Sequence, residues 1–171
     1  MGKVIRTYAL GQFEDLVATS TTQSLAYRLG DTVDVADDDN KVITRYMYIY
    51  ARNALVQYGL YQITYTGTAG REVGAATFPS SSAVYIQVCV PQVAIASGSY
   101  GWVAVKGLVN ITATTDVAAG DVGEGIKSIA TVTSSAATAK TIYAVCTFVA
   151  SRTGAGTVAC YLYGERINIA A

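Results

Sequence analysis

The side chains most often used for catalysis are scarce in this sequence. The 171-residue chain contains no histidine, so the commonest general base is missing, and neither a Ser-His-Asp nor a Cys-His site can be built. Eight of the twelve acidic residues are aspartates, and most stand in turn-like contexts. Paired carboxylates are the one acid–base arrangement left to the chain. We therefore expect a protein that is not an enzyme and that holds no cofactor.

The cysteines offer little chemistry either. Cys89, Cys146 and Cys160 are an odd, widely spaced set, unlike a disulfide framework. They lack CxxC spacing and have no histidine to complete a metal site. Each lies in an apolar run, which predicts a small buried hydrophobic side chain. The first residues also lack the apolar stretch of a signal peptide, so we expect synthesis in a reducing cytoplasm.

Two kinds of segment resemble ligand-binding loops superficially. Residues 37–40 are acidic, but Lys41 and Val42 stand where a calcium loop needs an oxygen ligand and a glycine. The segments 98–102 and 120–125 are rich in glycine, yet they lack the helix and the lysine of a phosphate loop. We interpret all three segments as structural turns, and we predict no metal site.

The balance of charge excludes two classes of partner. Twelve basic residues match twelve acidic ones, which gives no electrostatic signature for nucleic acid and none for an anionic membrane surface. No apolar run reaches the length needed to span a bilayer. Only 14% of the residues are charged while 51% are hydrophobic, so we expect part of the surface to be covered by a partner or by other copies of the chain.

The hydrophobic pattern is that of strands and turns. Short alternating runs rich in Val, Ile, Thr and Tyr are separated by Gly, Ser, Asp and Asn. The sequence predicts an all-β, single-domain antiparallel β-sandwich or barrel, jelly-roll-like, over residues 25–171. Residues 1–24 alternate poorly and are expected to form an N-terminal arm that orders on binding. The predicted strands are 33–35, 41–51, 60–66, 83–96, 100–107, 108–114, 141–150, 157–163 and 167–169. In the segment 123–133 the three-residue spacing of Ile126, Ile129 and Val132 allows a short helix, but the neighbouring Thr and Ser favour a strand or irregular structure.

Tyrosine dominates the aromatic residues. Thirteen tyrosines and one tryptophan stand against three phenylalanines, and tyrosine suits positions with one buried and one wet end. In the run 41–51, Tyr46, Tyr48 and Tyr50 fall on one face of the predicted strand. This stripe is interpreted either as an interface or sugar-stacking face, or as a sheet face packed under a loop or a second sheet.

Several segments carry a resemblance to a known group of proteins. They are Leu-Gly-Asp-Thr-Val at 29–33, Thr-Arg-Tyr-Met-Tyr at 44–48, Asn-Ala-Leu at 53–55, the block 93–107 with Tyr-Gly-Trp-Val at its centre, and the Ala-Ala-Gly-Asp turn at 118–121. This series resembles virion structural proteins of tailed bacteriophages, particularly small β-rich capsid decoration (cement) proteins. The resemblance covers residues 25 to 165.

The resemblance implies a protein on the virion, bound to the outside of the capsid and made in the bacterial host cytoplasm. It would bind the major capsid protein, often as a homotrimer, and brace neighbouring capsomers against the internal pressure of DNA. Many weak copies repeated by symmetry would gain strength through multivalency. The alternatives are a head-fibre or adhesin-type carbohydrate-binding module and a head–tail joining component. The candidate interface residues are Val4, Ile5, Tyr8, Phe13, Tyr46, Tyr48, Tyr50, Tyr100 and Trp102.

Overall fold

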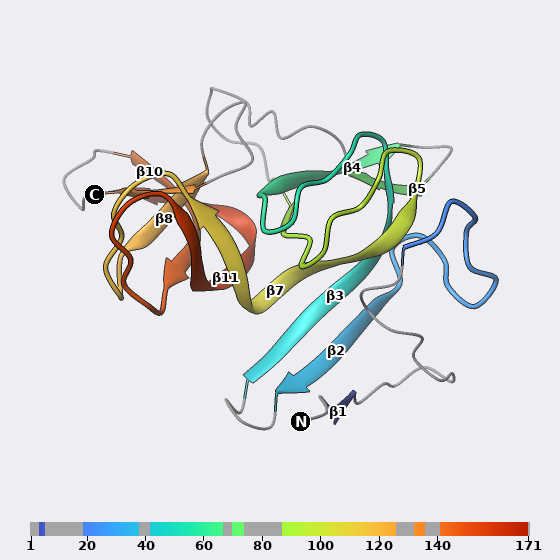
Figure 1. The fold of residues 1–171 in the computed structure, drawn as a ribbon, viewed down its shortest axis with the longest axis horizontal. Helices are drawn as coiled ribbons and strands as arrows, with labels where there is room; N and C mark the ends of the chain where they lie inside the picture. The colour runs from blue at the N-terminus through green and yellow to red at the C-terminus, as the bar shows by residue number, and fades with distance from the viewer. Residues whose placement is uncertain are drawn as a thin grey trace.

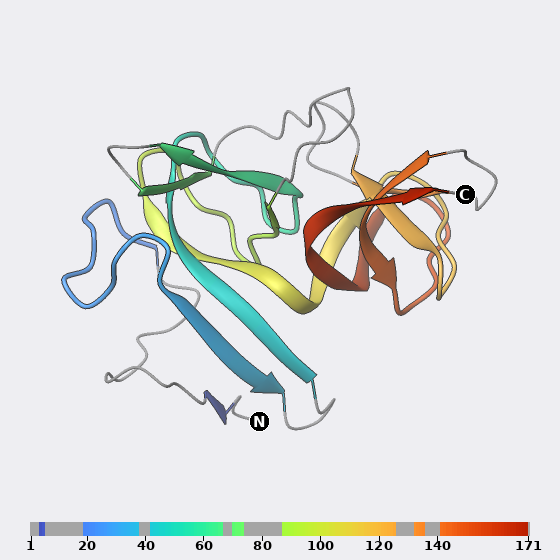
Figure 2. The same cartoon turned by 180° about the vertical axis from the view of Figure 1, so that it is seen from behind.

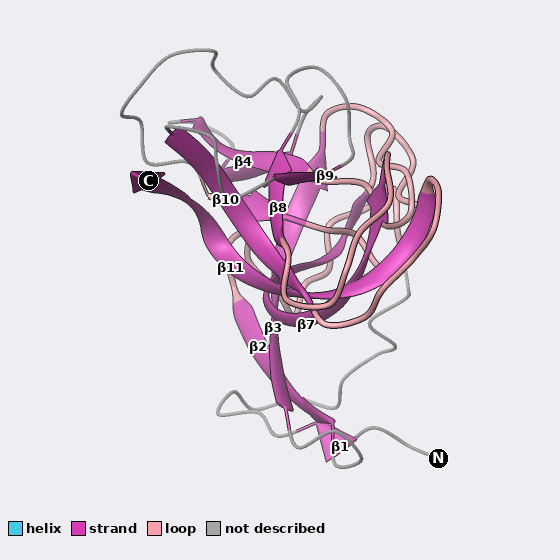
Figure 3. Ribbon diagram, turned by 90° about the vertical axis from the view of Figure 1, so that its left-hand side faces the viewer, coloured by secondary structure: helices cyan, strands magenta, loops and turns pink. Residues whose placement is uncertain are grey.

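Strands make up all the regular secondary structure in the part of the chain that the computed structural model describes, which is residues 4–5, 19–37, 42–66, 70–73, 87–125, 132–135 and 141–170. Figure 3 shows strands and loops over these ranges and no helix, which confirms the all-β prediction. The strands are β1 (Val4–Ile5), β2 (Thr32–Asp37), β3 (Val42–Ala51), β4 (Tyr61–Thr66), β5 (Gly70–Val73), β6 (Val88–Cys89), β7 (Tyr100–Ala113), β8 (Val122–Gly125), β9 (Val132–Ser135), β10 (Thr141–Phe148) and β11 (Gly156–Ala170).

The strands form one long, mostly antiparallel sheet that is not closed. Nine of them follow the order β11-β10-β8-β9-β7-β3-β5-β4-β6, and β2 joins at β3 with β1 on its outer edge. β11 also pairs with β7, so the C-terminal strands curl back on themselves into a separate lobe. Figure 1 shows this C-terminal lobe beside a lobe built around β3 to β6. No helical segment among the described residues has the length and apolar character that a membrane crossing requires.

β7 belongs to both lobes. Its first half pairs with β3, with Tyr100 opposite Tyr50 and Trp102 opposite Tyr48. Its second half pairs with β11, from Gly107 opposite Leu162 to Ala113 opposite Gly156. The sequence predicted two strands here, 100–107 and 108–114, because a glycine at 107 is a usual end to a strand. That separation is wrong, since the glycine lies inside one strand of 14 residues.

Gly107 is the point at which β7 changes partner. Its φ is +107°, a conformation that L side chains rarely adopt. A Cβ at this position would lie 2.7 Å from the Cα of Thr44 and would also meet the backbone oxygen of Ile43. The Thr44 hydroxyl donates to the backbone oxygen of Leu108 at 3.0 Å, directly beyond the change of partner. Because Gly107 has no side chain, the backbone of β3 at Ile43 and Thr44 can lie this close to β7.

A single cluster of buried apolar side chains runs through both lobes. Ile49, Leu55, Leu60 and Ile95 fill its N-terminal part, and Phe148 lies in its C-terminal part. The C-terminal hairpin follows the predicted alternation, because Cys146 and Phe148 on β10 face Val158, Cys160 and Leu162 on β11, and all five are buried. The predicted separate strand 167–169 is the end of β11.

One turn recurs three times and fixes how the strands begin. It has glycine at its third position with φ between +78° and +96°, and the N–H of its fourth residue donates back to the C=O of its first. In each copy the glycine N–H donates to the C=O of a strand residue at 2.8 Å, and that residue's N–H donates back to the fourth residue of the turn. The copies are residues 28–31 on Tyr48, 96–99 on Ala51 and 118–121 on Phe148.

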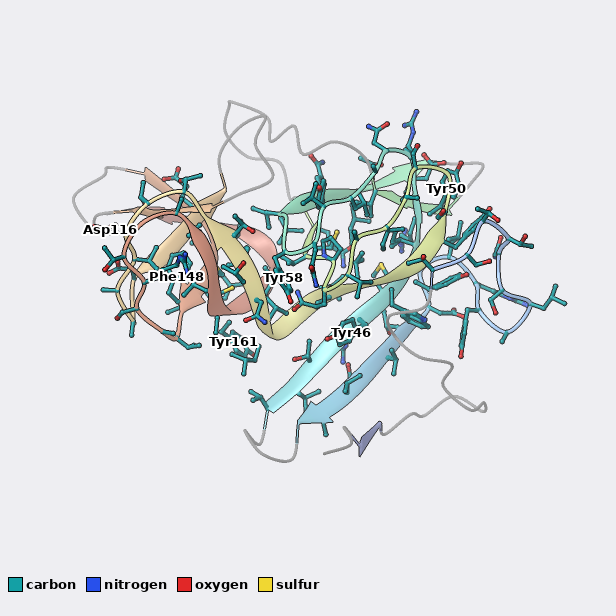
Figure 4. The ribbon with its side chains drawn as sticks, in the orientation of Figure 1. Tyr46, Tyr50, Tyr58, Asp116, Phe148 and Tyr161 are labelled. Carbon is teal, nitrogen blue, oxygen red and sulfur yellow. The ribbon has the colours of Figure 1, made fainter. Side chains whose placement is uncertain are left out.

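Residues 56–59 form a variant of this turn with tyrosine in place of the glycine. Gly59 N–H donates to the Val56 oxygen at 3.1 Å, and Tyr58 takes the third position with φ of +63°. Tyr58 N–H donates to the oxygen of Pro91, which has no N–H to give in return. Instead the backbone oxygen of Tyr58 accepts a hydrogen bond from the backbone N–H of Thr112, in the second half of β7. In Figure 4 Tyr58 accordingly lies toward the junction of the two lobes.

Candidate interaction surface

The thiols lie out of reach of any substrate. Cys89, Cys146 and Cys160 are fully buried, as the sequence predicted. Burial raises the pKa of the Cys89 thiol well above its usual range. The hydrogen bond with Cys146, and then burial, raise the pKa of Cys160. A buried thiol that keeps its proton is a poor nucleophile and a poor metal ligand.

Thiol labelling tests this arrangement. With an aromatic disulfide reagent at mildly alkaline pH, the three cysteines of the folded protein are expected not to react, whereas all three react after unfolding in denaturant. A Val56→Cys variant is the positive control, because this side chain is 64% exposed and its thiol should react at once. Rapid reaction of the native chain without Val56→Cys would contradict the buried placement.

Three of the described acidic side chains, Asp31, Asp34 and Asp121, make structural contacts. Asp34 on β2 and Arg45 on β3 form a paired bridge with N–O distances of 2.7 and 2.8 Å on the open face of the sheet. The hydrogen bond from Arg45 lowers the pKa of Asp34. Asp31 and Asp121 each accept from the first N–H of their own turn. Within the described ranges, no group of three or more acids or cysteines is arranged to hold a metal ion.

The tyrosine stripe is mostly a packed face. Tyr46, Tyr48 and Trp102 are 7%, 4% and 5% exposed, so nearly all of each side chain is covered by the chain itself. Tyr50 and Tyr100 are half-buried, and their ring centroids lie 5.1 Å apart at the end of the stripe. Of the two interpretations left open by the sequence, burial favours the packed face for Tyr46, Tyr48 and Trp102. Their role in an assembly interface stays a prediction.

A loop of residues 19–31 packs over the aromatic cluster formed by Tyr48, Tyr50, Tyr100 and Trp102. Tyr27 lies with its ring centroid 5.1 Å from Trp102 in an edge-on arrangement and 5.6 Å from Tyr48. The Tyr48 hydroxyl accepts the backbone N–H of Ser24 at 3.1 Å. The buried rings therefore form the base to which the loop is attached, and Figure 1 shows the loop (blue) standing out from the edge of the sheet.

The two ends of the loop are fixed to neighbouring strands. Ser20 exchanges two backbone hydrogen bonds with Tyr100 on β7, at 2.7 and 3.1 Å. At the other end, Gly30 and Asp31 make the recurring turn onto Tyr48 of β3. Because β3 and β7 are paired at these residues, the ends of the loop lie side by side. This is the geometry of a compact Ω-loop held by its own packing.

Leu25 stands in the middle of this loop in the sequence. Its exposed fraction is 107%, the highest among the large exposed hydrophobic residues of the described ranges. The others are Val56 at 64%, Ile43 at 60%, Val149 at 49% and Tyr161 at 36%. Figure 2 shows the same loop from behind, clear of the sheet on that side as well. We take residues 19–31, supported by the aromatic cluster, as the candidate interaction surface.

Removing the Tyr48 hydroxyl tests whether the cluster holds the loop. Tyr48→Phe keeps the ring packing but removes the acceptor of the Ser24 N–H. We expect this to lower the free energy that holds the loop in place by about 1 kcal/mol. The amide of Ser24 should exchange with solvent roughly five- to tenfold faster. Tyr50→Phe removes a hydroxyl from the same cluster without touching Ser24 and is the matched control. Equal exchange at Ser24 in both variants would contradict this support.

Two of the four predicted interface residues of the N-terminal segment lie in the described part of the chain. Val4 and Ile5 lie in β1, with backbone paired to Ala36 and Val35 on the edge of β2. Tyr8 and Phe13 lie outside the described residues. Residues 19–24, which the sequence analysis placed in the arm, belong to the anchored loop. Leu25 and Tyr27 were missed, although a lone leucine inside an uncharged polar stretch was a visible signal.

Comparison with known proteins places the chain in no family. No family model matches it, and no curated protein does. Among solved structures it is similar to the N-terminal base of the head fibre gp8.5 of bacteriophage phi29, with 14% identity and a TM-score of 0.49. The match covers 71% of this chain and 96% of that one. At this identity and TM-score we draw no function from the likeness.

Proposed function

We propose that the protein is a structural component of a tailed-phage virion, bound to the outside of the capsid as a decoration protein. The observation that carries the proposal is that reactive side chains are buried while an apolar side chain is exposed. The thiols are buried in the described part of the chain, as are the rings of Tyr46, Tyr48, Tyr61, Trp102 and Phe148, whereas Leu25 is exposed on an anchored loop. That is the layout of a protein that binds through its surface.

The resemblance of the segments between residues 25 and 165 to decoration proteins supplies the partner. In this proposal the chain binds the major capsid protein, as a homotrimer that bridges capsomers, and braces the shell against packaged DNA. The fourteen-per-cent charge content agrees with a surface that is partly covered in its working state. The low affinity of one copy is offset by repetition over the shell.

Particles made without the protein test the proposal. Heads from an amber mutant of its gene are compared with the same heads after addition of the purified protein, during heating and during dilution into low salt. We expect added protein to bind in hundreds of copies and to delay release of DNA. Failure of the wild-type protein to bind the heads would overturn the proposal. Binding in a small ring at one vertex would favour the head–tail joining alternative.

The carbohydrate-binding alternative has less support from the aromatic face. Stacking on a sugar ring needs an open ring face, and among the five rings of the stripe and its β7 partners only Tyr50 and Tyr100 are more than slightly exposed. Binding of the isolated protein to a glycan array, or its adsorption to host cells, would favour this alternative. Loss of that binding in Tyr50→Ala would locate the sugar.

A further inference from the structure

Three of the five large hydrophobic side chains that are exposed in the described ranges lie around the point where β7 changes partner. They are Ile43 on β3, Tyr161 on β11 and Val149 directly after β10, and they are 60%, 36% and 49% exposed. Ile43 lies beside Gly107, because a Cβ at this glycine would meet its backbone oxygen. Tyr161 is the cross-strand partner of Leu108, the next residue of β7. The paired strands therefore gather these side chains in one region of the surface.

The register of the strands places these side chains on one face of the sheet. On β7, exposed or half-buried residues alternate regularly with buried ones from Lys106 onward. Ile43 and Arg45 flank the buried Thr44 on β3, and Arg45 is the cross-strand partner of Lys106. Because paired residues of neighbouring strands point to the same side, the exposed residues form one surface, which we call the junction face. Its members are Asp34, Ile43, Arg45, Lys106, Leu108, Asn110, Thr147, Val149, Ala159 and Tyr161.

Val149 joins this surface at the edge of the C-terminal lobe. Its backbone N–H donates to the oxygen of Ala159 at 3.0 Å, so the ladder between β10 and β11 continues one residue beyond Phe148. The Phe148 side chain points into the core, and the next side chain points outward. The apolar part of the junction face thus extends from β3 across β7 and β11, on strands that are already fixed in ladders. Such a surface loses little conformational entropy when it binds.

Lys106 gives the junction face an unbalanced positive charge. Asp34 is the one acid of this face, and its two oxygens are bonded to Arg45 at 2.7 and 2.8 Å. Among the described residues no acid forms an ion pair with Lys106. A partner that covered this face would remove water from the lysine, and this is unfavourable unless the partner supplies a carboxylate.

This requirement disfavours two other occupants of the face. A symmetric contact with a second copy of the chain would bring a second Lys106 to the interface and no spare carboxylate. A lipid surface is held by clusters of basic residues, whereas this face has a single lysine beyond the paired Arg45. The partner that fits is a protein surface with apolar side chains and an acidic group at their border.

We propose that the junction face docks on such an acidic and apolar surface of the capsid protein that the chain decorates. This inference rests on the proposed function and deepens it by assigning the contact face and the chemistry of the partner. Ile43, Val149 and Tyr161 are covered by the apolar part, and Lys106 pairs with the carboxylate. Figure 4 shows Tyr161 on the outside of the C-terminal lobe, where a partner can reach it.

Binding of single-residue variants to heads made without the protein tests this inference. Tyr161→Asp and Val149→Asp are each expected to weaken binding at least about 10-fold, because a charge would enter an apolar contact. Val56→Asp is the matched control, since Val56 is 64% exposed in the turn 56–59, and it should bind within about twofold of the wild type. Wild-type-like binding by both Tyr161→Asp and Val149→Asp overturns the inference and leaves the decoration function standing.

Variants of Lys106 test the charge of the partner. Lys106→Glu should weaken binding at least about 10-fold, whereas Lys106→Arg should bind nearly as the wild type does. Raising the salt concentration should weaken binding of the wild type several-fold and that of Lys106→Met much less. Equal binding by Lys106→Glu and Lys106→Arg would contradict an acidic partner surface.

Two further measurements separate this inference from a folding defect and from the proposed function. Thermal unfolding of each variant shows whether it is folded, and the charge changes at Lys106, which is exposed, should leave the unfolding temperature unchanged. A change of oligomeric state in Tyr161→Asp without any heads overturns the inference, because the face would then be covered by a second copy. Failure of the wild type itself to bind heads overturns the proposed function instead.

Discussion

Replacement of Gly107 by alanine is expected to destabilise the whole molecule by at least about 3 kcal/mol. About 1 to 2 kcal/mol arises from placing a side chain at φ of +107°. The larger part arises because the new Cβ would meet the backbone of β3 at Ile43 and Thr44, and the backbone cannot rotate away as a side chain would. Urea unfolding of the purified protein measures the loss.

Gly120→Ala separates these two contributions. Gly120 has a similar φ of +93°, but a Cβ there would meet nothing within 4 Å. Gly120→Ala should lower the free energy of unfolding only by the cost of the backbone conformation, about 1 to 2 kcal/mol. If Gly107→Ala and Gly120→Ala were equally destabilised, the close approach of the β3 backbone to Gly107 would be disproved.

Phe148→Ala is expected to cost about 3 to 5 kcal/mol. Phe148 is 1% exposed and is among the largest fully buried side chains of the described residues. Its ring lies against Gly123 of β8, where a Cβ would come within 3.3 Å of the ring, and truncation to alanine would leave a cavity there. Figure 4 shows it inside the C-terminal lobe, while Asp116 lies at the outer edge of that lobe.

The next residue in the chain supplies the control for Phe148. Val149 is 49% exposed, and Val149→Ala should change the free energy of unfolding by less than about 0.5 kcal/mol. Urea unfolding of both variants measures their stability. If the free energy of unfolding depends on urea concentration equally in both, the difference in stability comes from the core. A loss below about 1 kcal/mol in Phe148→Ala would mean that the C-terminal lobe does not pack as described.

Alternation of apolar residues was enough to predict the all-β class and most of the strands. It worked best for β11, where Val158, Cys160 and Leu162 alternate regularly into the core, whereas β10 has a bulge between Ala144 and Cys146 and Val145 is buried as well. It failed at Gly107, because a glycine that ends a strand and one that permits a close approach of two strands look alike in a sequence. The difference depends on Thr44, which lies more than sixty residues earlier in the chain.

The candidate surface was less accessible to prediction. The tyrosine stripe was found, but its burial depends on Tyr27 and other residues far from β3 in the sequence, which the pattern of one strand cannot reveal. The loop of residues 19–31 was missed because it has neither alternation nor helical spacing. Its order comes from long-range bonds to Tyr48 and Tyr100.

The shared strand β7 also determines how the molecule bears mechanical load. A force that separates the two lobes pulls along the backbone of β7. It also shears the β7–β3 and β7–β11 ladders, in which many hydrogen bonds must break at the same time. Two lobes joined by a linker would part at their weakest contact. Tension received by one lobe would therefore reach the other directly through β7.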